Sequence, residues 1–103
     1  MTTLSVVVFK REQWWVAQCL QHDIGAQSLS NVDDVIYELQ RSIVGHIAIC
    51  KQHNLEPFGS LGRAPQMYWD KFEAASNRLT PMSQPFRSPI PELTPPQEYR
   101  IAA

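Results

Sequence analysis

Short apolar runs separated by polar breaks occupy the first thirty residues. "LSVVVF" (4–9) and "WWVAQCL" (14–20) are β-branched or aromatic runs of strand length, with the polar break "KREQ" between them. This arrangement predicts a hairpin with a loop of about four residues. "IGAQSL" (24–29) predicts a short third strand, in which Gly25 indicates a bulge or a close approach of backbone.

The first two predicted strands are apolar on both faces. Successive side chains of a strand point to opposite faces, so Trp14 and Trp15 belong to different sides of the sheet. The run "VVVF" has the same two-sided character. We therefore expect each face of the sheet to be covered by another element.

A long helical pattern follows the third strand. Ser30 predicts the helix start, with Asp33 three residues later as a weaker form of the capping box, and the pattern continues to about His53. Gly45 costs on the order of 1 kcal/mol relative to alanine inside a helix, which suggests that something packs closely against it. One apolar stripe at helical spacing supports the helix: Val32, Ile36, Leu39, Ile43 and Ile47.

A second helical pattern lies in "APQMYWDKFEAASNRL" (64–79), where Pro65 suits the first turn. We expect this helix to pack on the other face of the sheet or on a dimer partner. The alternative is an exposed helix that binds a partner protein. The stripe of this helix comprises Tyr68, Phe72, Ala75 and Leu79.

The end of the chain is rich in proline. Residues 81–96 contain six prolines in sixteen positions, which is typical of extended chain rather than of a packed element. We therefore divide the chain into a sheet-and-helix domain (1–54), a loop with an amphipathic helix (55–80) and a proline-rich extended tail (81–103). The predicted fold class is α+β, a small three-stranded antiparallel sheet with a long helix on one face and a second short helix.

Composition narrows the classes of function. A length of 103 residues with 44% hydrophobic residues suits one small globular domain. A net charge of −1 gives no electrostatic drive towards nucleic acid or anionic membranes, so we expect neither as a partner. No N-terminal signal and no apolar run of membrane-spanning length is visible, which predicts a cytoplasmic protein.

The stretch "WWVAQCLQHDIGAQSLSNVDDVIYELQRSIVGHI" has an aromatic residue before Val-Ala, then a cysteine, a short strand with a glycine, and an acidic helix start. This pattern resembles the HicB-like domain, the antitoxin half of bacterial HicA–HicB toxin–antitoxin pairs, and the similarity covers residues 4–53. The later "APQMYWDKFEAA" resembles a segment that follows this domain in a stand-alone subgroup. The matching positions are Trp15, Val16, Ala17, Cys19, Gly25, Ser30, Asp33 and Asp34.

The resemblance implies a shortened ribonuclease-H-like fold without the nuclease's carboxylate cluster. It also implies a non-enzymatic homodimer that neutralises a partner protein by binding it directly. The implied partner is a small basic ribonuclease toxin, so we expect an acidic docking site at Asp33, Asp34 and Glu38.

Family antitoxins often carry a C-terminal DNA-binding domain, and this chain departs from that pattern. Residues 55–103 hold five acidic and five basic residues, and one short helix cannot form a helix-turn-helix. We therefore expect no direct DNA binding. The alternative functions are a stand-alone inhibitor or scaffold of a protein other than a toxin, and a dimer that binds a small molecule or a metal.

Two Cys-x-x-His pairs are the candidate metal ligands, Cys19 with His22 and Cys50 with His53. On a regular strand Cys19 and His22 face opposite ways, and Cys19 falls where the HicB-like family has an ordinary core cysteine. We therefore favour two buried free thiols and two surface histidines, and expect no metal and no other cofactor.

Catalytic patterns are weak. His46, Cys50 and His53 share a helical face, but this spacing supplies neither hydrogen-bond reach nor an orienting group for a cysteine nucleophile. Nuclease chemistry needs clustered carboxylates, and outside the predicted helix the N-terminal part offers Asp23 and Glu12. We expect no enzymatic activity.

The second helix offers aromatic candidates for partner binding, namely Tyr68, Trp69 and Phe72. Aromatic residues are favoured at protein interfaces, while the alternative role for each is the core. Trp69 lies off the main stripe and is the best candidate for an exposed anchor.

Overall fold

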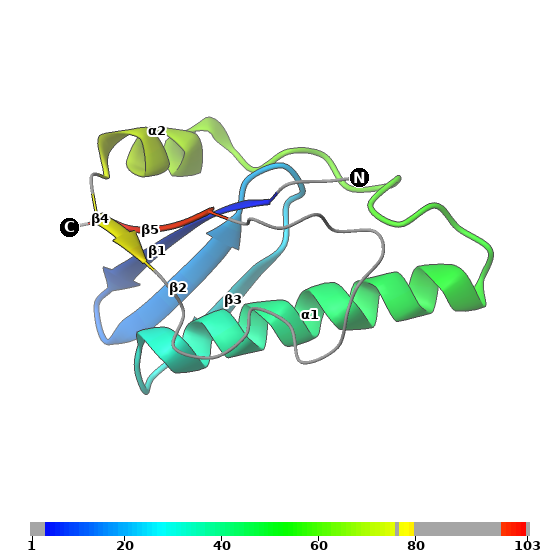
Figure 1. Ribbon diagram of the computed structural model, residues 1–103, viewed down its shortest axis with the longest axis horizontal. Helices are drawn as coiled ribbons and strands as arrows, with labels where there is room; N and C mark the ends of the chain where they lie inside the picture. The colour runs from blue at the N-terminus through cyan, green and yellow to red at the C-terminus, as the bar shows by residue number, and fades with distance from the viewer. Residues whose placement is uncertain (1–3, 76, 80–97, 103) are drawn as a thin grey trace.

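One mixed β-sheet with a helix on each face forms the described part of the protein (Figure 1). The computed structural model describes residues 4–75 and 98–102 and the backbone of residues 77–79. This arrangement confirms the predicted α+β class. The elements in chain order are β1 (Ser5–Arg11), β2 (Trp14–Cys19), β3 (Gly25–Ser28), α1 (Val32–Gln52), α2 (Gln66–Ala74), β4 (Asn77–Leu79) and β5 (Glu98–Ile101).

The sheet has the strand order β3-β2-β1-β5-β4. β1 and β2 pair antiparallel, as do β2 and β3, in agreement with the N-terminal prediction. β5, however, pairs parallel to β1, with Tyr99 opposite Val6, and β4 pairs antiparallel to β5. The prediction of a purely antiparallel sheet of three strands is therefore wrong, because the described residues form five strands that include a parallel pair.

β5 also corrects the prediction for the end of the chain. An unpacked tail over residues 81–103 is wrong for residues 98–101, which form a strand between β1 and β4. Tyr99 is 3% exposed, and its hydroxyl oxygen accepts a hydrogen bond from Nε2 of Gln40 at 3.2 Å. A strand of four residues is too short for a clear period-two signal, and its burial depends on a distant strand. Residues 81–97, most of the predicted tail, lie outside the described residues.

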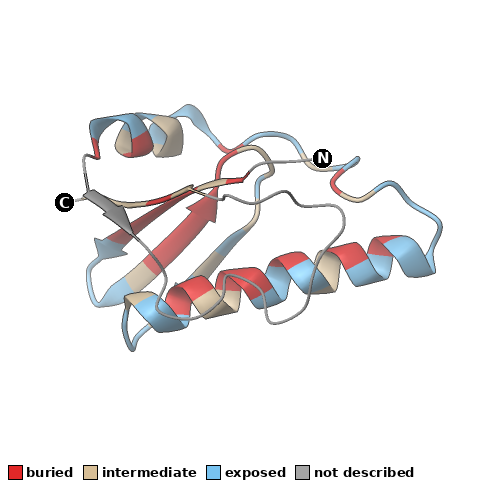
Figure 2. Cartoon of the chain, viewed as in Figure 1, coloured by how far each residue is buried: buried red, intermediate tan, exposed pale blue. Residues whose placement is uncertain are grey.

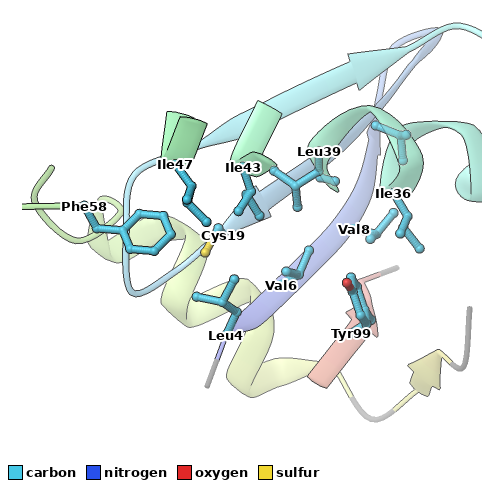
Figure 3. Close-up of a cluster of buried hydrophobic side chains, with 12 residues drawn as sticks. Leu4, Val6, Val8, Cys19, Ile36, Leu39, Ile43, Ile47, Phe58 and Tyr99 are labelled. Atoms are coloured by element: carbon cyan, nitrogen blue, oxygen red, sulfur yellow. The ribbon is translucent and has the colours of Figure 1, made fainter. Parts of the chain in front are cut away.

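α1 covers one face of the sheet and closes the larger core. Figure 2 shows that its buried positions are turned towards the strands, and Figure 3 shows the side chains that meet there. Trp15 packs against this cluster and is half-buried. The buried members are Leu4, Val6, Val8, Ala17, Cys19, Val35, Ile36, Leu39, Ile43, Ile47, Phe58 and Tyr99.

α2 lies over the opposite face of the sheet (Figure 1), where it contacts β1. Tyr68 and Trp69 pack at the margin of this smaller cluster. The two clusters together explain why β1 is apolar on both of its faces. The buried members of the smaller cluster are Val7, Phe9, Val16, Leu20, Ala64 and Phe72.

Both helices differ from the prediction at one end. The N-cap of α1 is Asn31 rather than Ser30, because the Asn31 side chain accepts the hydrogen bond from the Asp34 N–H at 2.8 Å. α2 ends at Ala74, because the next residue is extended, and Leu79 therefore belongs to β4 instead of the helix stripe.

The sequence predicts a close approach at two glycines, Gly25 and Gly45, and their surroundings differ. At Gly25 a Cβ atom would lie 2.6 Å from Oε1 of Gln18, so the predicted close approach is present, with a side chain. At Gly45 no atom of the described residues lies within 4 Å of an added Cβ, so the predicted close packing against this position is not found in the described part of the chain.

The described helices include none that is long and apolar enough to span a membrane.

Candidate functional site

Two histidine rings stack on Phe58 where the loop after β2 meets the second half of α1. The ring centroids of His22 and Phe58 are 4.2 Å apart with planes inclined by 8°, and those of His46 and Phe58 are 5.2 Å apart with planes inclined by 24°. Phe58 lies at one end of the larger core, beyond Ile47 and Cys19 (Figure 3). This stack joins three segments that are separate in the sequence.

Hydrogen bonds hold Phe58 in an uncommon backbone conformation. Its φ is 67°, in the left-handed region that residues other than glycine rarely adopt. Its N–H donates to Nε2 of His46 at 3.0 Å, and Sγ of Cys50 lies 3.5 Å from the same nitrogen. Because Nε2 accepts this hydrogen bond, the neutral His46 ring carries its proton on Nδ1. A side chain of α1 thus fixes the loop that follows the helix.

Burial shifts the pKa of two groups at this end of the core, His22 and Cys19, in the direction that favours their uncharged forms. Both ring nitrogens of His22 are buried and have no hydrogen-bond partner among the described residues. Burial lowers the pKa of His22, and the neighbouring His46 lowers it further. Burial raises the pKa of the Cys19 thiol, against the opposing effect of nearby backbone N–H groups. A thiol of raised pKa is a poor nucleophile at neutral pH, so the geometry supports packing rather than chemistry.

The two Cys-x-x-His pairs do not converge on one point. Cys19 and Cys50 are free, buried thiols, while His22 stacks on Phe58 and His53 forms the exposed C-cap of α1. Within residues 4–75 and 98–102, no group of three or more histidine, cysteine, aspartate or glutamate side chains is placed to hold a metal ion. His22 is also not the surface histidine that the sequence suggests.

The remaining acidic candidates have different surroundings. Asp23 accepts a hydrogen bond from Nε2 of the buried Gln18 at 2.8 Å, which is a structural role. Asp33 and Asp34 are exposed in the first turn of α1. Glu38 forms an exposed ion pair with Arg41 at 3.2 Å, so part of its charge is compensated. The predicted acidic docking patch therefore consists mainly of Asp33 and Asp34.

The aromatic candidates of α2 face the sheet to different degrees. Phe72 is 5% exposed and belongs to the core. Trp69 is half-buried, its Nε1–H donates to the Ala64 carbonyl oxygen at 3.2 Å, and the Arg63 guanidinium lies 4.5 Å from its ring centroid. Tyr68 packs against Phe9 with ring centroids 5.9 Å apart. These contacts attach α2 to the sheet, and Trp69 is not the exposed anchor that its position off the stripe suggests.

The side of α1 that faces away from the sheet carries a surface that sequence reasoning missed. Val44 is 45% exposed and Ile49 is 59% exposed, and Gly45 and Ala48 lie with them on this side. We call these four residues the outer face of α1. Sequence reasoning missed them because the long apolar stripe that predicts the buried side of the helix gives no separate meaning to apolar residues on the other side.

Phe58 was also missed by sequence reasoning, because it stands in an irregular loop with no periodic pattern around it. The available signal was a lone aromatic residue between Pro57 and Gly59, which indicates a turn but not a contact with two histidines.

Comparisons with protein-family models, with curated proteins and with solved structures found no match.

Proposed function

We propose that this chain is a non-enzymatic interaction module of the HicB-like antitoxin type, which acts in the cytoplasm as a homodimer and neutralises a partner protein by binding it. The proposed partner is a small basic ribonuclease. No nucleic acid, membrane or cofactor takes part in this function.

The observation that carries the proposal is the exposed surface of α1. An acidic first turn, with Asp33 and Asp34, precedes the apolar outer face on the same helix. Exposed apolar residues flanked by charged ones are typical of protein-binding surfaces. The acidic turn would attract a basic partner and orient it during encounter.

The fold is compatible with the HicB-like resemblance. An antiparallel β1–β2–β3 unit with α1 across one face and a parallel strand beside β1 is consistent with a shortened ribonuclease-H-like unit. Two of the residues that carry the resemblance have structural roles in this fold. Cys19 fills the core, and Gly25 makes room for the Gln18 side chain.

Affinity capture from the native host tests the proposal. The tagged chain is compared with the double variant Asp33→Lys/Asp34→Lys and with a control, Glu56→Lys/Glu73→Lys, which makes the same charge change at exposed sites away from α1. We expect a small basic protein at equal stoichiometry with the wild type and the control, and its loss with the Asp33/Asp34 variant. The purified partner should cleave RNA, and one equivalent of the chain should stop the cleavage.

A larger partner without ribonuclease activity, bound equally by all three proteins, would contradict the antitoxin proposal. That outcome would instead support a stand-alone inhibitor or scaffold.

A further inference from the structure

We propose that the loop at residues 54–62 closes one end of the larger core while His46 is neutral and opens when this imidazole takes up a proton. We call these residues the post-helix loop, since they follow α1 and its C-cap. The opening is separate from the proposed partner binding, because it takes place beside the second half of α1 and not at its acidic first turn.

One hydrogen bond attaches the middle of the post-helix loop to the helix. In the described part of the chain, the bond from the Phe58 N–H to Nε2 of His46, at 3.0 Å, is the only hydrogen bond that joins residues 56–61 to another segment. The other hydrogen bonds of these residues are turns inside the loop itself. The position of the loop therefore depends on a single acceptor atom.

Backbone hydrogen bonds fix both ends of the post-helix loop. The Leu55 N–H donates to the Cys50 carbonyl oxygen at 2.8 Å, and the Gly62 carbonyl oxygen accepts from the Asp23 N–H at 2.8 Å. These bonds contain no titratable group, so mild acid leaves them in place. Protonation of His46 thus frees the middle of the loop and not the chain on either side of it.

Protonation of His46 reverses the role of the atom that holds Phe58. Neutral imidazole can offer Nε2 as an acceptor, whereas imidazolium carries a proton on both nitrogens and can only donate. The Phe58 N–H would then face a second donor. Phe58 has a φ of 67°, a strained conformation that persists only while its surroundings hold it. Loss of the hydrogen bond therefore lets the loop relax away from α1.

The titratable groups that face His46 supply no negative charge that would favour imidazolium in the closed state. Sγ of Cys50, on α1 itself, lies 3.5 Å from Nε2 of His46. The loop after β2 contributes His22, which stacks on the same Phe58 ring. β2 contributes the Cys19 thiol at this end of the core, and burial raises its pKa. Burial and the neighbouring His46 lower the pKa of His22, so a positive charge is poorly accommodated in this region.

Charged residues of the neighbouring segments are engaged or exposed. In the described part of the chain, neither histidine of the stack forms an ion pair. Asp23, in the loop after β2, accepts a hydrogen bond from the Gln18 side chain, and Glu56 is exposed in the post-helix loop. Lys51 is exposed at the end of α1. A charged His46 therefore gains more from water than from the closed loop, and opening supplies that water.

Opening uncovers apolar surface. Phe58 is 7% exposed in the closed state, and Ile47 and Cys50 beside it are 5% and 6% exposed. Phe58 lies at the end of the core in Figure 3, so its departure exposes the side chains next to it. The chain thus presents an additional apolar surface at acid pH while the sheet and α1 stay folded.

Hydrogen exchange of assigned backbone amides, followed by NMR at pH 7.5 and pH 5.5, tests the opening. Each measured rate is compared with the rate of the unfolded amide at the same pH, so that the protection factor reports opening and not the chemistry of exchange. The protection factor of the Phe58 amide should fall by about tenfold or more at pH 5.5. Those of the amides in β1 and β2 should change by less than about twofold.

Two variants of His46 separate the acceptor from the charge. His46→Gln places a side-chain oxygen as many bonds from Cα as Nε2 is and cannot take up a proton, so the Phe58 amide should stay protected at both pH values. His46→Phe keeps a ring beside Phe58 without an acceptor, so this amide should be weakly protected at both. His53→Gln is the matched control, because it removes an exposed histidine, and it should follow the wild type. Circular dichroism verifies that each variant is folded.

Three results would overturn the proposal. The first is equal protection of the wild-type Phe58 amide at both pH values, which needs no variant. The second is a fall in His46→Gln as large as in the wild type. The third is an equal fall in β1 and β2, which would mean global destabilisation. His22→Phe distinguishes the two histidines of the stack: it should keep the fall at Phe58, and loss of the fall in this variant would assign the response to His22 and refute the role of His46.

Discussion

Replacing His22 with phenylalanine tests the structural role of the stack on Phe58. The change keeps a planar ring 4.2 Å from Phe58 and removes two buried ring nitrogens that have no hydrogen-bond partner among the described residues. An unsatisfied buried polar group costs about 1–3 kcal/mol, so its removal offsets the small excess volume of the new ring. We expect the variant to be at least as stable as the wild type at pH 7.5.

The pH dependence gives the sharper test. The pKa of His22 is lower in the folded state than its usual value of about 6.5, so the unfolded chain binds more protons once the pH falls below that value. The contribution of this group to stability is therefore complete above about pH 6.5 and is lost as the pH falls towards the folded pKa. The loss is at most about 1.4 kcal/mol per pH unit. The advantage of His22→Phe over the wild type should accordingly grow by up to about 1 kcal/mol between pH 7.5 and pH 5.5.

Urea denaturation followed by tryptophan fluorescence at pH 7.5, 6.5 and 5.5 measures this difference. His53→Phe is the control, because it removes an exposed imidazole without touching the stack, and its stability should run parallel to that of the wild type. A constant difference between His22→Phe and the wild type across this pH range would refute the reasoning.

Three further variants test contacts of the fold, each by chemical denaturation. Tyr99→Ala should lower the free energy of unfolding by about 3–5 kcal/mol, because the ring is buried on β5; a loss under 1 kcal/mol would mean that this strand is not part of the stable fold. Gly25→Ala should cost about 1–3 kcal/mol, because its Cβ would meet Gln18, while Gly62→Ala, with open space around it, should change stability by less than about 0.5 kcal/mol. Arg100→Met should cost about 1–2 kcal/mol, because it removes hydrogen bonds to two carbonyl oxygens at the end of α2, and an unchanged midpoint would contradict this.

The N-terminal half of the fold was readable from the sequence because its signals are local. Runs of β-branched and aromatic residues of strand length predict β1 and β2, and a stripe with helical period predicts α1. The N-cap was misassigned by one residue because Ser30 and Asn31 are both good capping residues, and only the geometry of the Asp34 N–H distinguishes them. β5 was not readable, because the strand position of "EYRI" depends on pairing with β1 rather than on a pattern of its own.

The candidate site was less predictable than the fold, for a related reason. The sequence pairs His22 with Cys19 and His53 with Cys50 by spacing, whereas the folded chain brings His22 and His46 together on Phe58. Spacing describes neighbours along one element, and this stack joins a loop, a helix and a second loop. Contacts of this kind follow only from the tertiary arrangement.

The two sides of α1 show that spacing along one element also limits what the sequence reveals about a binding surface. Ile47 and Ile49 are chemically alike and two residues apart, yet one is buried in the core and the other is 59% exposed. Hydrophobic periodicity assigns the stripe of Ile47 to the core because it runs the length of the helix, and it gives no separate meaning to Val44 and Ile49. Once the sheet occupies one side, the apolar residues on the other side become a surface, and an exposed surface of this kind needs a partner to lower its free energy in water. The exposed apolar residues of α1 are therefore the part of this helix whose surroundings the described sheet does not explain, and they are the reason that the proposed function assigns a binding role to it.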